Sequence, residues 1–392
     1  MSSAILVINS GSSSIKFSLI EVESKQVLIS GLAEKLGLQD ASITVKTGGK
    51  ETVALSRHDH VGAMEAVLAS LRQHQLIDKV AAVGHRVVHG GEHFKSATRI
   101  TADVIANIEK CSAYAPLHNP AHLEGIKAAM TFAADVPHVA VFDTAFHQTM
   151  SPTSFLYALP YSFYQEHGIR RYGFHGTSYR YVCGEAARLL DIPLENSALV
   201  VAHLGNGASA TAILNGKSVD TTMGFTPLEG LIMGTRSGDL DPSLVAYMAE
   251  ITETSATDIV RLLNKKSGLL GISELSSDVR ELQKAAEDGH AGAILAIEMF
   301  VHRLAKYIGA LSTCLPRVDA LVFTGGIGEN SSLIRGKTIQ RLASIGYALD
   351  EEMNETRVGD NQGLITLTTS VKAVMINTNE ELMIALDTAA FI

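Results

Sequence analysis

Residues 4–20 read Ala-Ile-Leu-Val-Ile-Asn-Ser-Gly-Ser-Ser-Ser-Ile-Lys-Phe-Ser-Leu-Ile, and this stretch decides the fold. The apolar run Ala4–Ile8 is typical of a buried strand, and the turn residues of 9–14 interrupt it. From Ile15 to Ile20 apolar and polar residues alternate, which indicates a second strand rather than a helix. The stretch therefore predicts a β-hairpin with a tip of small residues, whose backbone N–H groups and hydroxyls can bind phosphate.

The second half of the chain repeats this pattern of strands and turns. A strand is expected at 197–203, a turn at Gly205–Gly207, and further strands at 208–214 and 217–222. Because each half opens with a hairpin whose tip is rich in Gly, Ser or Asn, the sequence predicts an α/β protein. Its two related domains would face each other across a cleft.

The remaining periodicity places further elements between and after these hairpins. Strands are expected at 83–88, 138–142, 319–323 and 371–376, and helices at 61–71, 120–130, 255–264, 278–286, 290–314 and 379–387. We expect an N-terminal domain of residues 1–150 and a C-terminal domain of residues 151–376, which carries the nucleotide site and the dimer interface. The last helix, about 377–392, is expected to pack back on the first domain.

Composition excludes several classes of protein. With 392 residues, of which 46% are hydrophobic, the chain has ample material for large cores and is not disordered. Its net charge of −9 argues against nonspecific binding of nucleic acid, so an anionic substrate needs a local cluster of cations. The three cysteines form no CxxC pair, and the N-terminus resembles neither a signal peptide nor a membrane span. We therefore expect a cytoplasmic protein that binds neither nucleic acid nor membrane.

Four charged or donor side chains stand in unusual places. Arg86 interrupts an apolar strand, and Asp143 ends another, where α/β proteins build sites. His175 and Arg236 are each flanked by glycines, which is uncommon for core residues. Three cationic or donor groups with one carboxylate are what phosphoryl transfer requires, because charge spreads over the oxygens of the transferred group.

Three other sequence patterns are less specific for a function. Gly205-x-Gly207-x-x-Ala210 matches a dinucleotide fingerprint, but a β-favouring run follows it where the fingerprint needs a helix. The i, i+4 pair His85 and His89 is either a metal pair or two hydrogen-bonded structural histidines. The glycine-rich run 325–330 is either an ordinary turn or a close approach of backbone to a flat ligand such as a purine.

Taken together, the motifs resemble those of the acetate and propionate kinase family of the actin–sugar kinase–Hsp70 superfamily. The resemblance runs from Ile5 to Leu386 and rests on the motifs at 9–16, 84–91, 115–120, 141–147, 171–177, 234–238, 325–329 and 378–381. It implies two duplicated actin/ribonuclease-H-like domains and a homodimer. It also implies reversible, Mg²⁺-dependent transfer of the ATP γ-phosphoryl group to acetate, giving acetyl phosphate and ADP.

The resemblance also implies roles for individual residues. Asn9 and Glu380 match the positions for Mg²⁺, for which Mn²⁺ can substitute, and Arg86 matches the ligand of the substrate carboxylate. The catalytic positions are Asp143, His175, Arg236 and His118, and the apolar pocket for the acyl methyl group comprises Val88, Leu117, Phe174 and Pro227. The nucleotide site comprises Lys16, His203, Leu204, Gly205, Asn206, Gly207, Asp278, Val279, Arg280, Gly325, Gly326, Ile327, Gly328 and Glu329.

Two departures and three alternatives accompany this reading. Many members of the family have Cys where Ser10 stands and His where Tyr179 stands, which leaves the supporting role of position 179 open. Propionate is the alternative acceptor, because a pocket discriminates one methylene by only about 1–3 kcal/mol. A non-catalytic ATP-binding regulator and an NAD enzyme are the alternatives of other classes.

Overall fold

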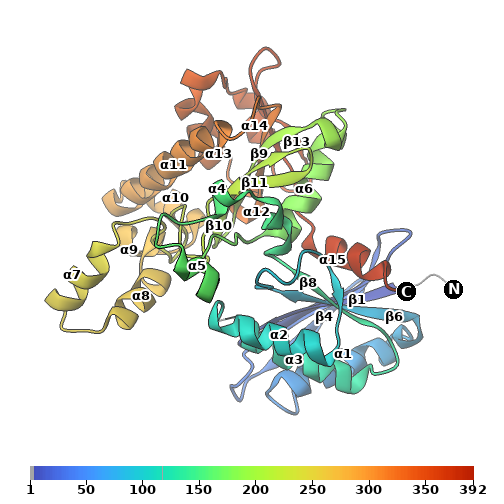
Figure 1. The fold of residues 1–392 in the computed structure, drawn as a ribbon. Helices are drawn as coiled ribbons and strands as arrows, with labels where there is room; N and C mark the ends of the chain where they lie inside the picture. The colour runs from blue at the N-terminus through green and yellow to red at the C-terminus, as the bar shows by residue number, and fades with distance from the viewer. Residues whose placement is uncertain (1–3, 117) are drawn as a thin grey trace. The chain divides into compact units, whose positions relative to one another are not determined.

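The computed structural model describes residues 4–116 and 118–392, which form an α/β protein (Figure 1). The chain divides into two compact units. Unit 1 comprises Met1–Gln148 together with Asn379–Ile392, and unit 2 comprises Thr149–Thr378. Unit 1 is therefore discontinuous, because its last helix returns to it after the whole of unit 2.

Unit 1 is built on an eight-stranded sheet in the order β5-β4-β3-β2-β1-β6-β8-β7. Its antiparallel part holds β1, β2, β3, β4 and β5, whereas β1, β6 and β8 are mutually parallel neighbours and β7 is antiparallel to β8. The strands are β1 (Ala4–Gly11), β2 (Ser14–Glu21), β3 (Val27–Glu34), β4 (Ser42–Lys46), β5 (Lys50–Ala54), β6 (Val80–Val87), β7 (Thr98–Arg99) and β8 (His138–Phe142). The predicted N-terminal hairpin is confirmed, with Gly11 opposite Ser14 at its tip.

Helices cover both faces of this sheet. The helices are α1 (His60–Gln73), α2 (Ala102–Lys110), α3 (Asn119–Phe132) and α15 (Glu380–Ala389), with short 3-10 turns η1 (Ile77–Lys79), η2 (Cys111–Ala113) and η3 (Ala145–Thr149). Val83 packs with residues of α1 and α3, and Val87 packs with residues of α2 and α3. Gly84 points to the opposite face, where a Cβ would stand 2.4 Å from Thr388 Oγ1 of α15. A glycine at this position therefore lets α15 approach β6 closely.

Unit 2 repeats the central pattern of unit 1 in a six-stranded sheet, with the order β11-β10-β9-β12-β14-β13. In both sheets three antiparallel strands precede two parallel ones: β3-β2-β1 before β6 and β8, and β11-β10-β9 before β12 and β14. The strands are β9 (Ala198–Leu204), β10 (Ala208–Leu214), β11 (Lys217–Thr221), β12 (Ala320–Thr324), β13 (Gly363–Leu364) and β14 (Lys372–Met375). This shared order shows the duplication that the two hairpins predicted.

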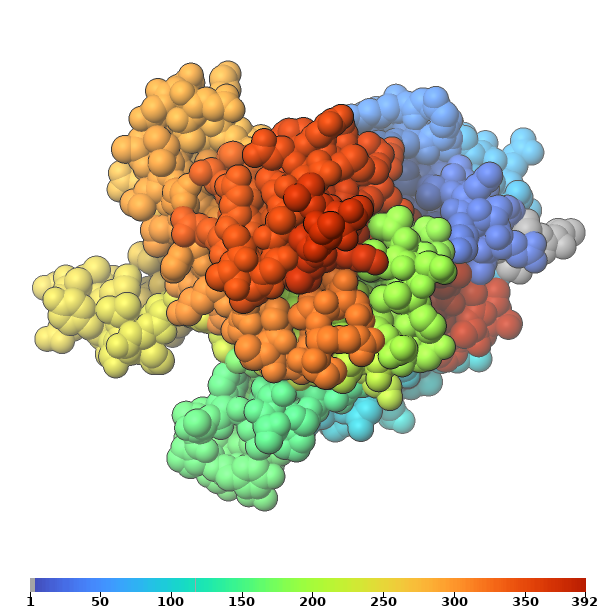
Figure 2. Space-filling model, turned by 90° about the horizontal axis from the view of Figure 1, so that it is seen from above, coloured from blue at the N-terminus to red at the C-terminus, as the bar shows by residue number. Residues whose placement is uncertain are grey.

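Most helices of the protein belong to unit 2. They are α4 (Pro152–Phe155), α5 (Ser162–His167), α6 (Gly176–Leu189), α7 (Ser243–Ile251), α8 (Ala256–Lys265), α9 (Gly268–Ser273), α10 (Val279–Glu287), α11 (Ala291–Ser312), α12 (Gly325–Asn330), α13 (Ser332–Arg341) and α14 (Glu351–Thr356), with 3-10 turns η4 (Leu194–Asn196) and η5 (Ala343–Ile345). The helices α7 and α8 project from the rest of unit 2 (Figures 1 and 2).

Two sequence expectations about glycine-rich segments have different outcomes. The dinucleotide fingerprint is rejected as expected, because Gly205–Gly207 form the turn of the β9–β10 hairpin and Ala208 pairs with Leu204. The run 325–330, in contrast, is not an ordinary turn. It forms the short helix α12 directly after β12.

Candidate active site

Three parallel strands of unit 1 end at one edge of its sheet and bring together residues that are far apart in the sequence. Ile8 of β1 pairs with His85 of β6, so Asn9 and Arg86 follow side by side. Asp143 comes directly after β8, and its N–H donates to Val87 O at 3.0 Å. This carboxyl edge is the usual place for a site in an α/β sheet.

Arg86 and Asp143 form an ion pair in which the carboxylate is buried and the guanidinium half-buried. Arg86 Nε lies 3.1 Å and 3.2 Å from the two carboxylate oxygens, and Nη2 donates to Asp143 Oδ2 at 2.6 Å. Burial raises the pKa of Asp143 and the Glu380 charge adds to the rise, while Arg86 opposes both. Burial lowers the pKa of Arg86, but the charges of Asp143 and Glu380 outweigh that effect, so the guanidinium stays charged.

The N-terminus of α15 contributes two further carboxylates to this edge. Glu380 lies 3.8 Å from Arg86 Nε, a longer contact than the 2.6 Å from Arg86 Nη2 to Asp143. Glu381 pairs with Lys16 Nζ at 2.5 Å and accepts a short hydrogen bond from Ser18 Oγ. Lys16, expected at the nucleotide, is therefore an ion-paired residue of unit 1 whose side chain is 58% exposed.

Two histidines interact electrostatically with the Arg86–Asp143 pair. His118 is the N-cap residue of α3, and its charge acts on both Asp143 and His122. Burial, with the Arg86 charge adding to it, lowers the pKa of His122 to about 3, so this ring is neutral. A neutral His122 adds no second positive charge beside Arg86.

The structure shows the role of His85, the first histidine of the predicted pair His85 and His89. His85 Nε2 is hydrogen-bonded to His138 Nδ1 at 2.9 Å, and His138 Nε2 donates to Ala133 O. Burial keeps the pKa of His85 well below its usual value. No cluster of three or more His, Cys, Asp or Glu side chains fit for a metal occurs in residues 4–116 and 118–392. His85 is a structural histidine.

In unit 2, His175 and Arg236 converge on the turn of the β9–β10 hairpin. A Cβ on Gly207 would lie 3.4 Å from Arg236 Nη1 and 3.7 Å from His175 Nε2. His175 precedes α6 with a φ of 59°, a left-handed conformation that is rare for a non-glycine residue and typical of functional positions. Arg236 Nη1 donates to Pro227 O at 3.1 Å, and burial lowers the pKa of Arg236.

The four residues of the expected acyl pocket belong to different units. Val88 is buried in unit 1, whereas Phe174 is buried and Pro227 half-buried in unit 2. Leu117 lies outside the described residues. Their convergence on one methyl group remains a prediction.

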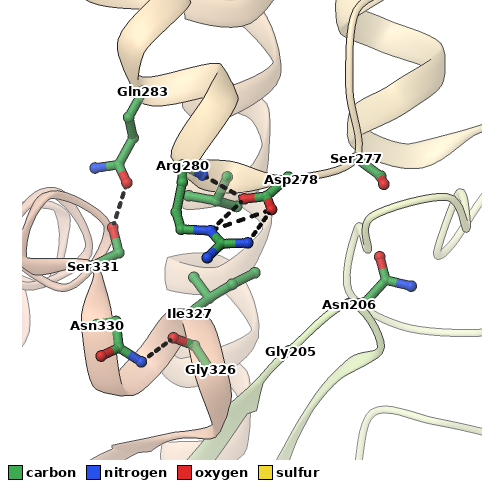
Figure 3. Close-up of a pocket in the computed structure, with 11 residues that line it drawn as sticks. Gly205, Asn206, Ser277, Asp278, Arg280, Gln283, Gly326, Ile327, Asn330 and Ser331 are labelled. Atoms are coloured by element: carbon green, nitrogen blue, oxygen red, sulfur yellow. Dashed lines mark hydrogen bonds and ion pairs between the residues drawn. The ribbon is translucent and has the colours of Figure 1, made fainter. Parts of the chain in front are cut away.

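A cavity of about 690 Å³ lies within unit 2 (Figure 3). Seven of the fourteen expected nucleotide residues line it: Gly205, Asn206, Asp278, Val279, Arg280, Gly326 and Ile327. They come from the β9–β10 hairpin, the start of α10 and the start of α12. Asp278 caps α10 by accepting from Arg280 N, and it binds the Arg280 guanidinium, which lowers the pKa of Asp278. The guanidinium itself is mostly exposed.

Other expected nucleotide residues serve the frame of this cavity. Glu329 Oε1 accepts from the N–H groups of Gly325 at 2.9 Å and Thr378 at 3.0 Å, so its carboxylate stabilises the start of α12. Gly325 has a φ of 75°, and a Cβ there would lie 2.8 Å from Leu204 O. Gly328 is buried as well, and His203 stacks on His175 at 4.2 Å between ring centroids.

Sequence reasoning missed four residues that line the cavity: Ser277, Gln283, Asn330 and Ser331. Two signals could have found most of them. Ser277 and Asn330 adjoin predicted motifs, and Gln283 lies one helical turn after Arg280. Asn330 Nδ2 donates to Gly326 O at 2.9 Å, and Ser331 Oγ lies 3.4 Å from Gln283 Oε1 (Figure 3).

Comparisons with known proteins agree over nearly the whole chain. Residues 4–386 match the Acetokinase family. The chain is 56% identical to a protein of Chromobacterium violaceum named acetate kinase, over 99% of this chain and 98% of that protein. It is 53% identical to acetate kinase 1 of Neisseria meningitidis serogroup A, with 98% of each chain covered.

Solved structures give the same result. A propionate kinase from Francisella tularensis superposes with a TM-score of 0.96 at 45% identity, covering 100% of both chains. The acetate kinase of Porphyromonas gingivalis gives a TM-score of 0.94 at 43% identity, covering 99% of both chains. The fold and these relatives define an enzyme of the kinase class, a phosphotransferase whose acceptor is a carboxyl group. Within that class, the chain belongs to the acetokinase family. No helix in the described part of the chain is long and apolar enough to span a bilayer.

Proposed function

We propose that this protein transfers the γ-phosphoryl group of ATP to acetate, reversibly, and so forms acetyl phosphate and ADP. The observation that carries the proposal is the full-length match: 56% identity to a protein named acetate kinase over 99% of this chain. The Arg86–Asp143 pair and the cavity beside α12 supply matching chemistry, a cation for a carboxylate and a space for a nucleotide.

The acceptor needs positive charge more than it needs a base. Acetate is ionised at neutral pH, because carboxyl pKa values lie near 4, and its oxygen can attack phosphorus in line without losing a proton. The main barrier is repulsion between a carboxylate and a polyanionic triphosphate. We assign Arg86 to the acetate carboxylate and Asp143 to the orientation of Arg86, which it contacts at 2.6 Å.

The transferring group is assigned to unit 2. Arg236 and His175 converge on Gly207, so their donors can meet charge that develops on the phosphoryl oxygens. We place the nucleotide in the cavity lined by the hairpin turn, α10 and α12, with its flat base passing close to Gly326. The space there is open, since a Cβ on Gly326 would meet no other atom within 4 Å.

We propose Asn9 and Glu380 as the residues that hold Mg²⁺. The donor set fits, since an amide and a carboxylate are oxygen ligands of the kind Mg²⁺ prefers. Among residues 4–116 and 118–392, the contact of the Glu380 carboxylate with a cation is the long one of 3.8 Å to Arg86 Nε, so the carboxylate keeps acceptor capacity. When bound, Mg²⁺ supplies charge neutralisation for the phosphates. Mn²⁺ has the same ligand preference and can replace it.

The hydroxamate assay tests the proposed reaction. Purified protein is incubated with MgATP, hydroxylamine and acetate, propionate or butyrate in parallel, and acyl hydroxamate is measured. We expect the highest kcat/KM with acetate and a lower value with propionate. A ranking led by propionate would favour the second acceptor, which the fit to the Francisella tularensis propionate kinase supports. A protein that binds ATP but forms no hydroxamate with any acid would be a regulator.

We propose further that the protein is a homodimer that associates through unit 2. The residues of α7 are mostly apolar, yet none is buried, and Leu244, Tyr247 and Ile251 are 43%, 59% and 60% exposed. An apolar helix surface of this kind is typical of a protein interface. Sedimentation analysis should give twice the chain mass, and Tyr247→Glu should shift the protein to monomer. A wild-type monomer would refute this.

The state of the cysteines supports a cytoplasmic location. Cys111 and Cys183 are buried and free, and Cys314 is exposed and free. Free thiols of this kind persist in a reducing compartment. Fractionation of the native host should recover the protein with cytoplasmic markers.

A further inference from the structure

Tyr179 lies one turn of α6 after His175, and its side chain is fully buried. Its hydroxyl is 2.5 Å from Ser209 Oγ of β10, and the same Ser209 oxygen is 2.8 Å from His175 Nδ1. Burying a hydroxyl costs free energy unless it is hydrogen-bonded. The Tyr179 hydroxyl is hydrogen-bonded to Ser209, which offsets this cost. Ser209 is also hydrogen-bonded to the ring of His175, a proposed catalytic residue.

The direction of the hydrogen bonds follows from counting protons. Thr221 Oγ1 donates to the Ala210 carbonyl, and it lies 2.7 Å from Thr211 Oγ1. Thr211 in turn hydrogen-bonds with the Tyr179 hydroxyl. Because each hydroxyl has one proton, the donors are satisfied when they run towards the carbonyl, in the order His175 Nδ1–H, Ser209, Tyr179, Thr211 and Thr221. Burial raises the pKa of Tyr179, so its hydroxyl keeps the proton that this order requires.

The hydrogen bond to Ser209 fixes the position of Nδ1 in the His175 ring. Its Nε2 then faces Gly207, where Arg236 Nη1 also arrives. The ring of His203 stacks on the face of the His175 ring, at 4.2 Å between centroids. When both ring nitrogens carry a proton, Nε2 can donate to a phosphoryl oxygen, and that hydrogen bond is charge-assisted.

We propose that Tyr179 is a positioning residue, which acts through Ser209 to hold His175 Nδ1–H and to aim Nε2 at the transferring phosphoryl group. The proposal rests on the proposed function for its catalytic consequence. The hydrogen-bonded arrangement itself does not depend on that function.

Two variants and one control test the arrangement by kinetics. Tyr179→Phe removes only the hydroxyl, and Ser209→Ala removes the link to the histidine. We expect each variant to lower kcat by about tenfold, which is the loss typical when a group that orients a metal-binding histidine is removed. The KM values for ATP and acetate should stay within about twofold of wild type. The double variant should be no worse than Ser209→Ala alone. Tyr181→Phe, on the same helix but partly exposed, should leave both constants unchanged.

Long-range ¹H–¹⁵N spectra of histidine-labelled protein give a readout that needs no substrate. Signals of His175 are assigned by their absence in His175→Gln. At alkaline pH we expect Nδ1 to be the protonated nitrogen in wild type, and Tyr179→Phe to give a mixture of tautomers. Unchanged His175 signals in Tyr179→Phe would overturn the proposal, and so would losses in kcat that add in the double variant. A wild-type enzyme inactive with acetate would refute the proposed function and leave the spectroscopic result standing.

Discussion

Replacing Arg86 with alanine should expose how strongly unit 1 depends on one buried ion pair. The change removes three close nitrogen–oxygen contacts of 2.6–3.2 Å and leaves the carboxylate of Asp143, only 1% exposed, without its cation. Removing one partner of a buried pair costs about 3–5 kcal/mol. The Arg86 side chain is 22% exposed, so water can reach part of the gap. We therefore expect the lower end, a loss of about 3 kcal/mol in the free energy of unfolding at pH 8.

The size of this loss should depend on pH in a definite direction. Burial raises the pKa of Asp143, and Arg86 opposes the rise, so the variant should have a still higher pKa at this group. An acid with a higher pKa in the folded state binds a proton on folding. Its destabilising effect is complete above the folded pKa and fades as the pH falls towards the unfolded value near 4. The difference between variant and wild type should therefore shrink from pH 8 to pH 5.

Urea unfolding followed by circular dichroism measures these differences, since the chain has no tryptophan for fluorescence. Arg86→Ala, Asp143→Asn and the double variant are compared at both pH values. The double variant should lose less than the sum of the single losses, because it leaves no buried charge unpaired. A single variant Arg86→Ala that unfolds at the wild-type urea concentration at pH 8 would refute the reasoning, as would a loss that is the same at both pH values.

Three further outcomes are expected. Val88→Ala should raise kcat/KM for propionate and butyrate relative to acetate by several-fold, because each CH₂ that fills the enlarged pocket gains up to about 0.8 kcal/mol; an unchanged ranking with a large fall in Tm would place Val88 in the core. Arg236→Ala should lower kcat by roughly 10²–10³ with little change in the KM for ATP, and loss of ATP affinity alone would move it to the nucleotide site. Gly325→Ala should weaken ATP binding and lower Tm, because its Cβ would lie 2.8 Å from Leu204 O. The control Gly326→Ala places its Cβ in open space and should keep the wild-type Tm, so equal Tm values for the two variants would contradict the reasoning.

The parts of the fold that were predicted from sequence have strong local signals. The hairpins β1–β2 and β9–β10 combine apolar runs with turn residues. The strands β3–β5 were not predicted. All five residues of β5 are exposed, so the apolar alternation that marks a half-buried strand is absent there.

Helix α12 shows why other parts of the site could not be predicted. Its sequence, Gly-Gly-Ile-Gly-Glu-Asn, has a poor intrinsic tendency to form helix. The fully buried Arg335 of α13 donates to Gly328 O at 2.9 Å and Glu329 O at 3.1 Å, and so satisfies carbonyls near the end of α12. A tertiary contact of this kind cannot be seen in a window of sequence. The same holds for Arg86 and Asp143, each of which stood out alone but whose pairing required the sheet register.

Because unit 1 is discontinuous, the ribosome synthesises its sheet well before its last helix. Helix α15 closes one face of the first sheet, yet residues 149–378, 230 in all, are synthesised between that sheet and this helix. At roughly 5–20 residues per second, the sheet waits about 12–46 seconds for its last helix. During this interval Gly84 lacks Ile384 and Thr388 of α15, which are buried against the sheet in the finished protein, so the nascent chain exposes a sheet face that ribosome-associated chaperones can bind.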